Sequence, residues 1–253
     1  MSLVLLFAEK TARQLRRDAA GTAITVLTTP VCTALYGLLS RGGDGPTGRP
    51  FEASVPGLLV LSVIMIVFSS AMLVAREIES GAMTRMATWP VSALDVLGGS
   101  SLVQLGLAAA SSAATLASAR ALGYAPRASL LSVLVLAVVA AQSSIGLGLL
   151  VASLTRTQHR AFLVASVLMF VLLLFSGVVF PRPHVELVQI AGEKIGPFDL
   201  LPTTQLHEAL SGVLAGKSLL DVKGRLLALF GLSAVAFGAG VLVFSRRHTL
   251  GGR

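Results

Sequence analysis

Six long runs of the sequence contain no Asp, Glu, Lys, Arg or His. About 20 apolar residues, at a helical rise of about 1.5 Å each, cross the hydrocarbon core of a bilayer. Each run has this length, and only 13% of the whole chain is charged, against roughly 25% in soluble domains. We therefore predict an all-α integral membrane protein with spans at residues 20–39, 57–75, 97–119, 129–154, 161–180 and 226–245.

The distribution of basic residues predicts how the chain is oriented. Six spans place both termini on one side, where the predicted loops carry eleven basic and five acidic residues, against nine and seven on the other side. Cytoplasmic loops are enriched in Lys and Arg, so we predict cytoplasmic termini. The abundance of Arg, Ala, Gly and Leu is typical of a GC-rich bacterial genome, which indicates the bacterial cell membrane. The basic residues form no continuous stripe, which favours contact with membrane lipid over binding of nucleic acid.

The segments outside the spans indicate a single membrane domain over residues 1–253. Residues 1–19 have an apolar side opposite Lys10, Arg13 and Arg17, as in an amphipathic helix at the cytoplasmic interface. A solvated basic leader is the alternative. Residues 181–225 form the longest connection, on the predicted extracellular side. Within it, residues 185–195 and 206–214 fit two short amphipathic helices that cap the outer end of the spans, with simple surface helices as the alternative.

The third run carries a row of small residues that predicts close helix packing. Its members are spaced by four and share one helical face, as is usual where two membrane helices approach closely. They are Gly106, Ala110, Ala114 and Ser118.

The sequence offers little material for catalysis or ion coupling. No span holds an acidic side chain, a basic side chain or a histidine, which disfavours a carrier driven by protons or sodium. The four histidines have no HExxH spacing, and a GxSxG elbow, a Walker A loop and a metal-ligand cluster are all missing from the sequence. We therefore predict no catalytic residue, no metal and no cofactor in this chain. Gln104 and Gln142 are the strongest polar residues within the spans; hydrogen bonding across a helix interface is favoured over a role in a transport path.

The segment at residues 76–92, between the second and third spans, is the most informative connection. It begins with alternating charges and continues with Met83 and Met86, three residues apart, before Trp89 and Pro90. This order predicts a short cytoplasmic helix with two flexible apolar anchors for a partner protein. An ordinary connecting loop with an interfacial Trp is an equally good interpretation of the residues alone.

The same segment resembles the pattern R-E-x-E-x-G-T-x-x-x-L-x-x-x-P of ABC-2 type permeases, the group that includes daunorubicin-resistance-like exporters. Ala82 replaces the Thr of the pattern and Met86 replaces its Leu. A second stretch, at residues 201–216, resembles the L-P-x-x-x-x-x-E-A-L-x-G-x-L-x-G segment of the family. The run that carries the first resemblance is Arg76, Glu77, Glu79, Gly81, Met83, Met86 and Pro90, in which Met83 stands at a position that the pattern leaves open.

The resemblance implies a function for these residues. Residues 77–88 would be a coupling helix that docks on a separate ATP-binding cassette subunit, which would bind ATP and Mg. Glu77, Glu79 and Arg85 would make charged contacts at the rim of that interface, around Gly81, and Met83 and Met86 would be its anchors. The family also implies a twelve-span dimer with a second permease, paired through small-residue faces and the first and fifth spans.

Outward transport of an amphipathic compound, such as an antibiotic, is the activity that the resemblance favours. Export of a lipid, glycolipid or polysaccharide precursor is the second reading, and an ion-coupled secondary carrier the third. A membrane-embedded enzyme or a structural scaffold would be favoured by activity without an ATPase partner.

Overall fold

The computed structural model describes residues 3–40, 50–82, 92–155, 157–177, 188–190, 193–195 and 197–247. The long helices are α1 (Leu3–Arg17), α2 (Ala19–Leu39), α3 (Phe51–Glu79), α5 (Ala93–Ala121), α6 (Leu130–Leu154), α7 (Gln158–Phe175) and α9 (Lys223–Arg247). The shorter elements are strands β1 (Val188–Ile190) and β2 (Glu193–Ile195), the 3-10 helix η2 (Pro197–Leu200) and helix α8 (Pro202–Leu214).

Six of these helices, α2, α3, α5, α6, α7 and α9, are long and apolar enough to cross a membrane. The six predicted spans are therefore confirmed. Most of the helices extend beyond the predicted limits, and α3 covers Phe51–Glu79 where residues 57–75 were expected. The extra turns carry Glu52, Arg76 and Glu77, because a helix can continue past the apolar core into the polar interface of a bilayer.

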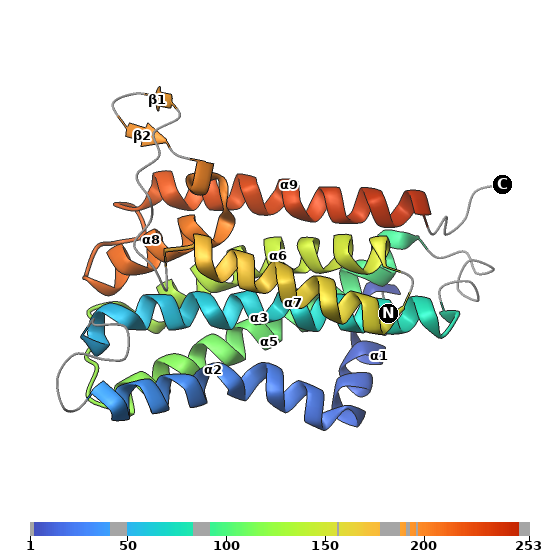
Figure 1. Ribbon diagram of the computed structural model, residues 1–253, viewed down its shortest axis with the longest axis horizontal. Coiled ribbons are helices and arrows are strands. Elements are labelled where there is room, and N and C mark those ends of the chain that lie inside the picture. The colour runs from blue at the N-terminus through green and yellow to red at the C-terminus, as the bar shows by residue number, and fades with distance from the viewer. Residues whose placement is uncertain are drawn as a thin grey trace.

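The spans run alongside one another, and α1 lies across their direction at one end of the bundle (Figure 1). Helices α3 and α6 form its centre: 67% and 61% of their apolar segments are buried, against 17% for each of α7 and α9. Helix α6 packs against both α3 and α9. The start of α2, the ends of α3 and α9 and the start of α7 share the end of the bundle where α1 lies (Figure 1).

Two glycines allow α6 and α9 to pack with their backbones in contact. A Cβ on Gly146 of α6 would lie 2.5 Å from the carbonyl carbon of Ala236, and a Cβ on Gly240 of α9 would lie 2.5 Å from the Gly146 oxygen. No side chain fits at those distances. This crossing uses the principle of small residues at membrane helix interfaces, but at positions other than the predicted row.

The predicted row of small residues on α5 is only partly packed among the described residues, since Ala114 and Ser118 are half-buried. Gly106 and Ala110 are exposed, and no atom lies within 4 Å of the position that a Cβ on Gly106 would occupy. The packed face of α5 is rotated away from this row and carries Gln104, Ala108 and Thr115 among its buried residues.

Several helix starts are set by capping residues that the sequence places just before each apolar run. Ser92 and Asp95 form a reciprocal capping box at α5, Ser129 caps α6 and Thr157 caps α7. Each side chain accepts a hydrogen bond from one of the free N–H groups of the first helical turn.

The expected helix at residues 185–195 is wrong where the structure describes this segment. Residues Val188–Ile190 and Glu193–Ile195 form an antiparallel two-stranded sheet, in which Val188 pairs with Ile195 and Gln189 with Lys194. Val188, Gln189 and Ile190 of β1 alternate β-branched and polar residues, a pattern of period two that suits a strand. The second expected helix, 206–214, lies within α8.

Candidate functional site

The predicted partner-binding segment starts later than expected, because its two glutamates belong to the end of α3. Helix α3 continues through Glu79 and ends at Ser80, whose N–H donates to the Arg76 carbonyl, while the Gly81 N–H donates to the Ile78 carbonyl. Gly81 follows with a φ of +67°, a backbone conformation that favours glycine. The expected separate helix from residue 77 is therefore wrong at its start. Met83, Arg85 and Met86 lie outside the described residues.

Glu77 connects the end of α3 to α1. Its Oε1 accepts a hydrogen bond from the Lys10 ammonium at 2.7 Å, and its side chain is only 10% exposed, against 43% for Lys10. A carboxylate so buried is stabilised by a cationic partner, and the α1 lysine supplies it. Glu77 thus makes its ion pair within this chain.

Glu79 connects the same end of α3 to the start of α7. Its Oε2 accepts a hydrogen bond from the backbone N–H of Gln158 at 2.7 Å, while the Thr157 hydroxyl accepts one from the Arg160 N–H. Both contacts satisfy donors of the first turn of α7, and a carboxylate there is further favoured by the helix dipole. Two residues apart on α3, the two glutamates thus hold two different helices.

Helix α1 rests directly on the start of α5. A Cβ on Gly99 would lie 2.6 Å from the Val4 carbonyl oxygen and 2.7 Å from the Ala8 nitrogen, so only glycine allows this approach. A glycine pair, Gly98 and Gly99, at the start of an apolar run was the sequence signal for this contact. The glycine pair alone does not show which helix packs against it.

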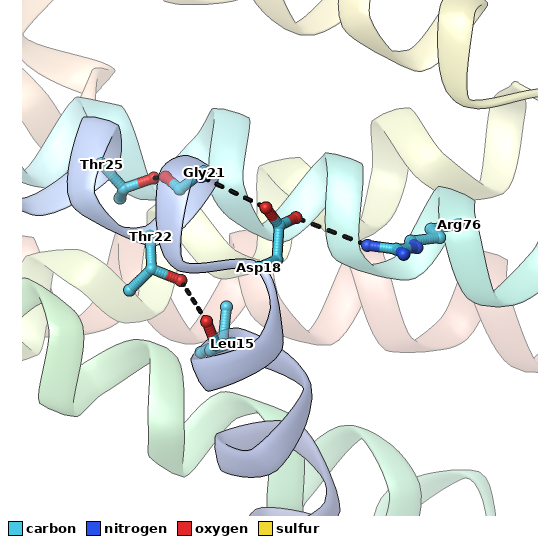
Figure 2. Close-up of polar contacts among 6 residues, drawn as sticks. All are labelled: Leu15, Asp18, Gly21, Thr22, Thr25 and Arg76. Atoms are coloured by element: carbon cyan, nitrogen blue, oxygen red, sulfur yellow. Dashed lines mark hydrogen bonds and ion pairs between the residues drawn. The ribbon is translucent and has the colours of Figure 1, made fainter.

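The elbow between α1 and α2 is tied to α3 through Asp18 (Figure 2). The Asp18 carboxylate accepts from the Gly21 N–H at 3.2 Å, which caps α2, and from the Arg76 guanidinium at 3.4 Å. The Thr22 hydroxyl donates to the Leu15 carbonyl at 2.9 Å across the bend. The sequence identified neither Lys10 nor Asp18 as a partner for residues 76–79, because the pairing depends on the angle of the elbow.

These contacts make the ends of α1, α2, α3, α5 and α7 into one connected unit at one end of the bundle. Its links are ion pairs, helix caps and a glycine contact, which position helices and do not perform bond chemistry. In the described ranges, no group of three or more His, Cys, Asp or Glu residues is arranged to hold a metal ion. The arrangement is suited to carrying a displacement between helices.

The structure does not bring the two predicted glutamines into this unit. Gln104 on α5 is 1% exposed, and its Oε1 accepts from the Ser69 hydroxyl of α3 at 3.2 Å. Its Nε2 has no hydrogen-bond partner among the described residues. Gln142 on α6 is half-buried. Gln104 therefore bridges two helices, which is the arrangement that the sequence favoured.

Comparison with known proteins gives one finding. A family model described as ABC-2 type transporter matches residues 2–198, a range that contains α1, the first five spans and the beginning of η2. A search of curated proteins found no match to the chain.

Proposed function

The chain belongs to the ABC-2 type transporter family, and from that premise we propose that it exports an amphipathic compound with energy from a separate ATPase subunit. Membrane domains of this family form the permease part of ABC exporters and lack ATPase motifs of their own. The sequence agrees, because it contains no Walker A loop. An ATP-binding cassette partner is implied by the family, and we expect that partner to bind the ATP and Mg.

The observation that carries the proposal is the double attachment of the end of α3. Glu77 pairs with Lys10 of α1, and Glu79 caps α7 through Gln158. The segment that we propose as the docking site starts directly after this point, at residue 80. A push on that segment would move α3 and α5 directly and would reach α1 and α7 through the two glutamates.

This arrangement assigns different roles to the motif residues. Glu77 and Glu79 would pass the displacement on inside the permease, and Met83, Arg85 and Met86 would touch the ATPase. Apolar side chains at the centre of an interface supply most of its binding energy, and charges at its rim affect the rate and specificity of association. Gly81 would allow the docking segment to turn away from α3, since its φ is +67°.

We place the docking segment and both termini on the cytoplasmic side of a bacterial cell membrane, on the distribution of Lys and Arg. A second permease would complete the complex. The exposed apolar face of α2, with Ile24 at 65% and Val31 at 53%, and that of α7, with Val167 at 64%, support pairing through the first and fifth spans. The open face of α5 around Gly106 is a further contact surface for a partner.

Two measurements test the proposal: co-purification of the ATPase subunit with the permease, and ATP-dependent export of the compound from vesicles. We expect the detergent-solubilised permease to retain a subunit with Walker motifs. M83E and M86E should release that subunit and abolish ATP-dependent export from vesicles, because a charge would replace an apolar anchor. The matched variants M83L and M86L should retain the ATPase subunit and keep ATP-dependent export.

Membrane insertion of all four variants is the control, since residues 83 and 86 lie outside the spans. Export of the compound against its gradient by the purified chain in liposomes without any ATPase would overturn the proposal. Normal export by M83E or M86E at normal expression would overturn the assignment of the docking segment.

A further inference from the structure

Two clefts meet at the elbow between α1 and α2. The larger, of about 720 Å³, lies between α1 and the end of α3 and is lined mainly by charged residues. The smaller, of about 160 Å³, is lined by α2 and α3 together with the end of α1. Gln14, Asp18 and Arg76 line both clefts, and Figure 2 shows Asp18 and Arg76 facing each other at this junction.

The larger cleft has an excess of positive charge. Four basic side chains line it, Lys10, Arg13, Arg17 and Arg76, against three acidic ones, Glu9, Asp18 and Glu77. Each acid is paired with one base: Glu77 with Lys10, Glu9 with Arg13 and Asp18 with Arg76. Among the described residues, Arg17 forms no ion pair. One negative charge placed here would balance the cleft.

Arg76 can bind a ligand while it keeps its contact with Asp18. The Arg76–Asp18 contact is long, at 3.4 Å, and both side chains are about half exposed, at 53% and 52%. An exposed pair of this kind contributes little stability. The guanidinium has five N–H donors in a planar fork that suits phosphate oxygens, so it can hold Asp18 and a phosphate together.

The smaller cleft is mainly apolar where it continues along the spans. Phe68, Met72 and Leu73 of α3 form one wall. On the α2 side, the hydroxyls of Thr22 and Thr25 donate to the Leu15 and Gly21 carbonyls. Little free polar surface therefore remains on the α2 side of the cleft, which suits a hydrocarbon chain.

Gln14 provides a further polar group at the junction. Its Oε1 is buried and has no hydrogen-bond donor among the described residues. A buried amide oxygen without a donor is costly, and a turn of the Gln14 amide into the cleft would let this oxygen accept from a hydroxyl of a bound molecule.

We propose that a glycerophospholipid binds at the elbow, with its phosphodiester against Arg17 and Arg76 and one acyl chain in the cleft beside Phe68 and Leu73. The single negative charge of the phosphodiester balances the charge of the cleft. A hydroxylated headgroup, as in phosphatidylglycerol, supplies the donor for Gln14. Basic pockets next to membrane helices are a common setting for lipid headgroups. The lipid braces the elbow and fixes the position of α1 relative to α3.

Phosphatidylglycerol binding to the delipidated protein in detergent, followed by native mass spectrometry, tests the proposal without an ATPase. R17Q should weaken binding about fivefold, the effect of one basic residue near a lipid surface. R16Q removes the same charge from the neighbouring exposed position, which does not line the cleft, and should leave affinity nearly unchanged.

The acyl-chain cleft has its own pair of variants. L73W fills the cleft and should abolish saturable binding, whereas L27W places the same side chain on the exposed face of α2, where Leu27 is 53% exposed, and should bind as the wild type does. A competition experiment needs no variant. Glycerophosphoglycerol, the deacylated headgroup, should fail to displace the bound lipid.

Three results would overturn the proposal. Equal losses in R16Q and R17Q would mean diffuse electrostatic attraction. Displacement of the lipid by glycerophosphoglycerol at similar concentration would mean a free anion site. Unchanged binding by folded L73W would mean that the cleft holds no chain. The lipid-binding measurement uses the permease alone. A negative result therefore leaves the proposed transport function standing, and a negative transport result leaves the lipid site standing.

Discussion

The Lys10 ammonium on α1 lies 2.7 Å from Oε1 of Glu77 at the end of α3, so a residue near the N-terminus is paired with the first glutamate of the R-E-x-E motif. The pair joins a helix outside the spans to the most buried span of the bundle. A tilt of α1 is thereby transmitted to α3, and a movement of α3 is transmitted to α1.

The Lys10–Glu77 pair is expected to be a true coupling. K10A, E77A and the double variant form a mutant cycle, and we expect an interaction energy of about 1 kcal/mol, because Lys10 is partly exposed and solvent screens the pair. Thermal unfolding in detergent measures it. A double variant whose loss equals the sum of the single losses would show that the two groups do not interact.

Glu79 is expected to act mainly as a cap of α7, through its hydrogen bond and not its charge. E79Q keeps a carbonyl oxygen for the Gln158 N–H, whereas E79A removes the acceptor. Loss of a cap costs about 0.5–2 kcal/mol. We expect faster hydrogen exchange of the Gln158 amide in E79A, with E79Q close to the wild type. Equal exchange in E79A and wild type would contradict the contact.

Gly99 is expected to be the position at which α1 tolerates no side chain. G99A places a Cβ 2.6 Å from the Val4 oxygen, and since that atom belongs to the backbone, α1 must move away. We expect a loss of about 1–3 kcal/mol, as for other overpacked positions, and easier proteolysis of α1. G238A on α9 is the control, because its Cβ would meet no atom within 4 Å; a similar loss in both variants would argue against this packing.

The sequence predicted the six spans because lipid leaves a chain few alternatives to apolar helices. Helix ends were less accurate where the helix continues into the polar interface, as at Arg76–Glu79, since charge there marks the edge of the apolar core and not the end of the helix. The hairpin at Val188–Ile190 and Glu193–Ile195 was missed because short apolar runs fit either a helix or a strand.

The candidate site was predictable only in part, and for a different reason. The pattern identified Glu77 and Glu79 by their spacing, but their partners Lys10 and Gln158 are 67 and 79 residues away in the chain. A sequence without tertiary contacts cannot pair such residues. The small-residue row from Gly106 was predicted as a close packing face, yet Gly106 and Ala110 are exposed, and the close contact between α6 and α9 joins Gly146 and Gly240.

Gln104 is expected to hold α5 to α3 and not to contact the transported compound. S69A removes the donor to Gln104 Oε1, and interhelical hydrogen bonds in membranes contribute about 0.6 kcal/mol on average. Q104L removes this hydrogen bond and also the Nε2 group that lacks a partner among the described residues, so its stability should change less than that of S69A. Because Gln104 is 1% exposed, Q104L should export at the wild-type rate in vesicles containing the ATPase. A folded, normally inserted Q104L with lost export would instead place this side chain on the transport path.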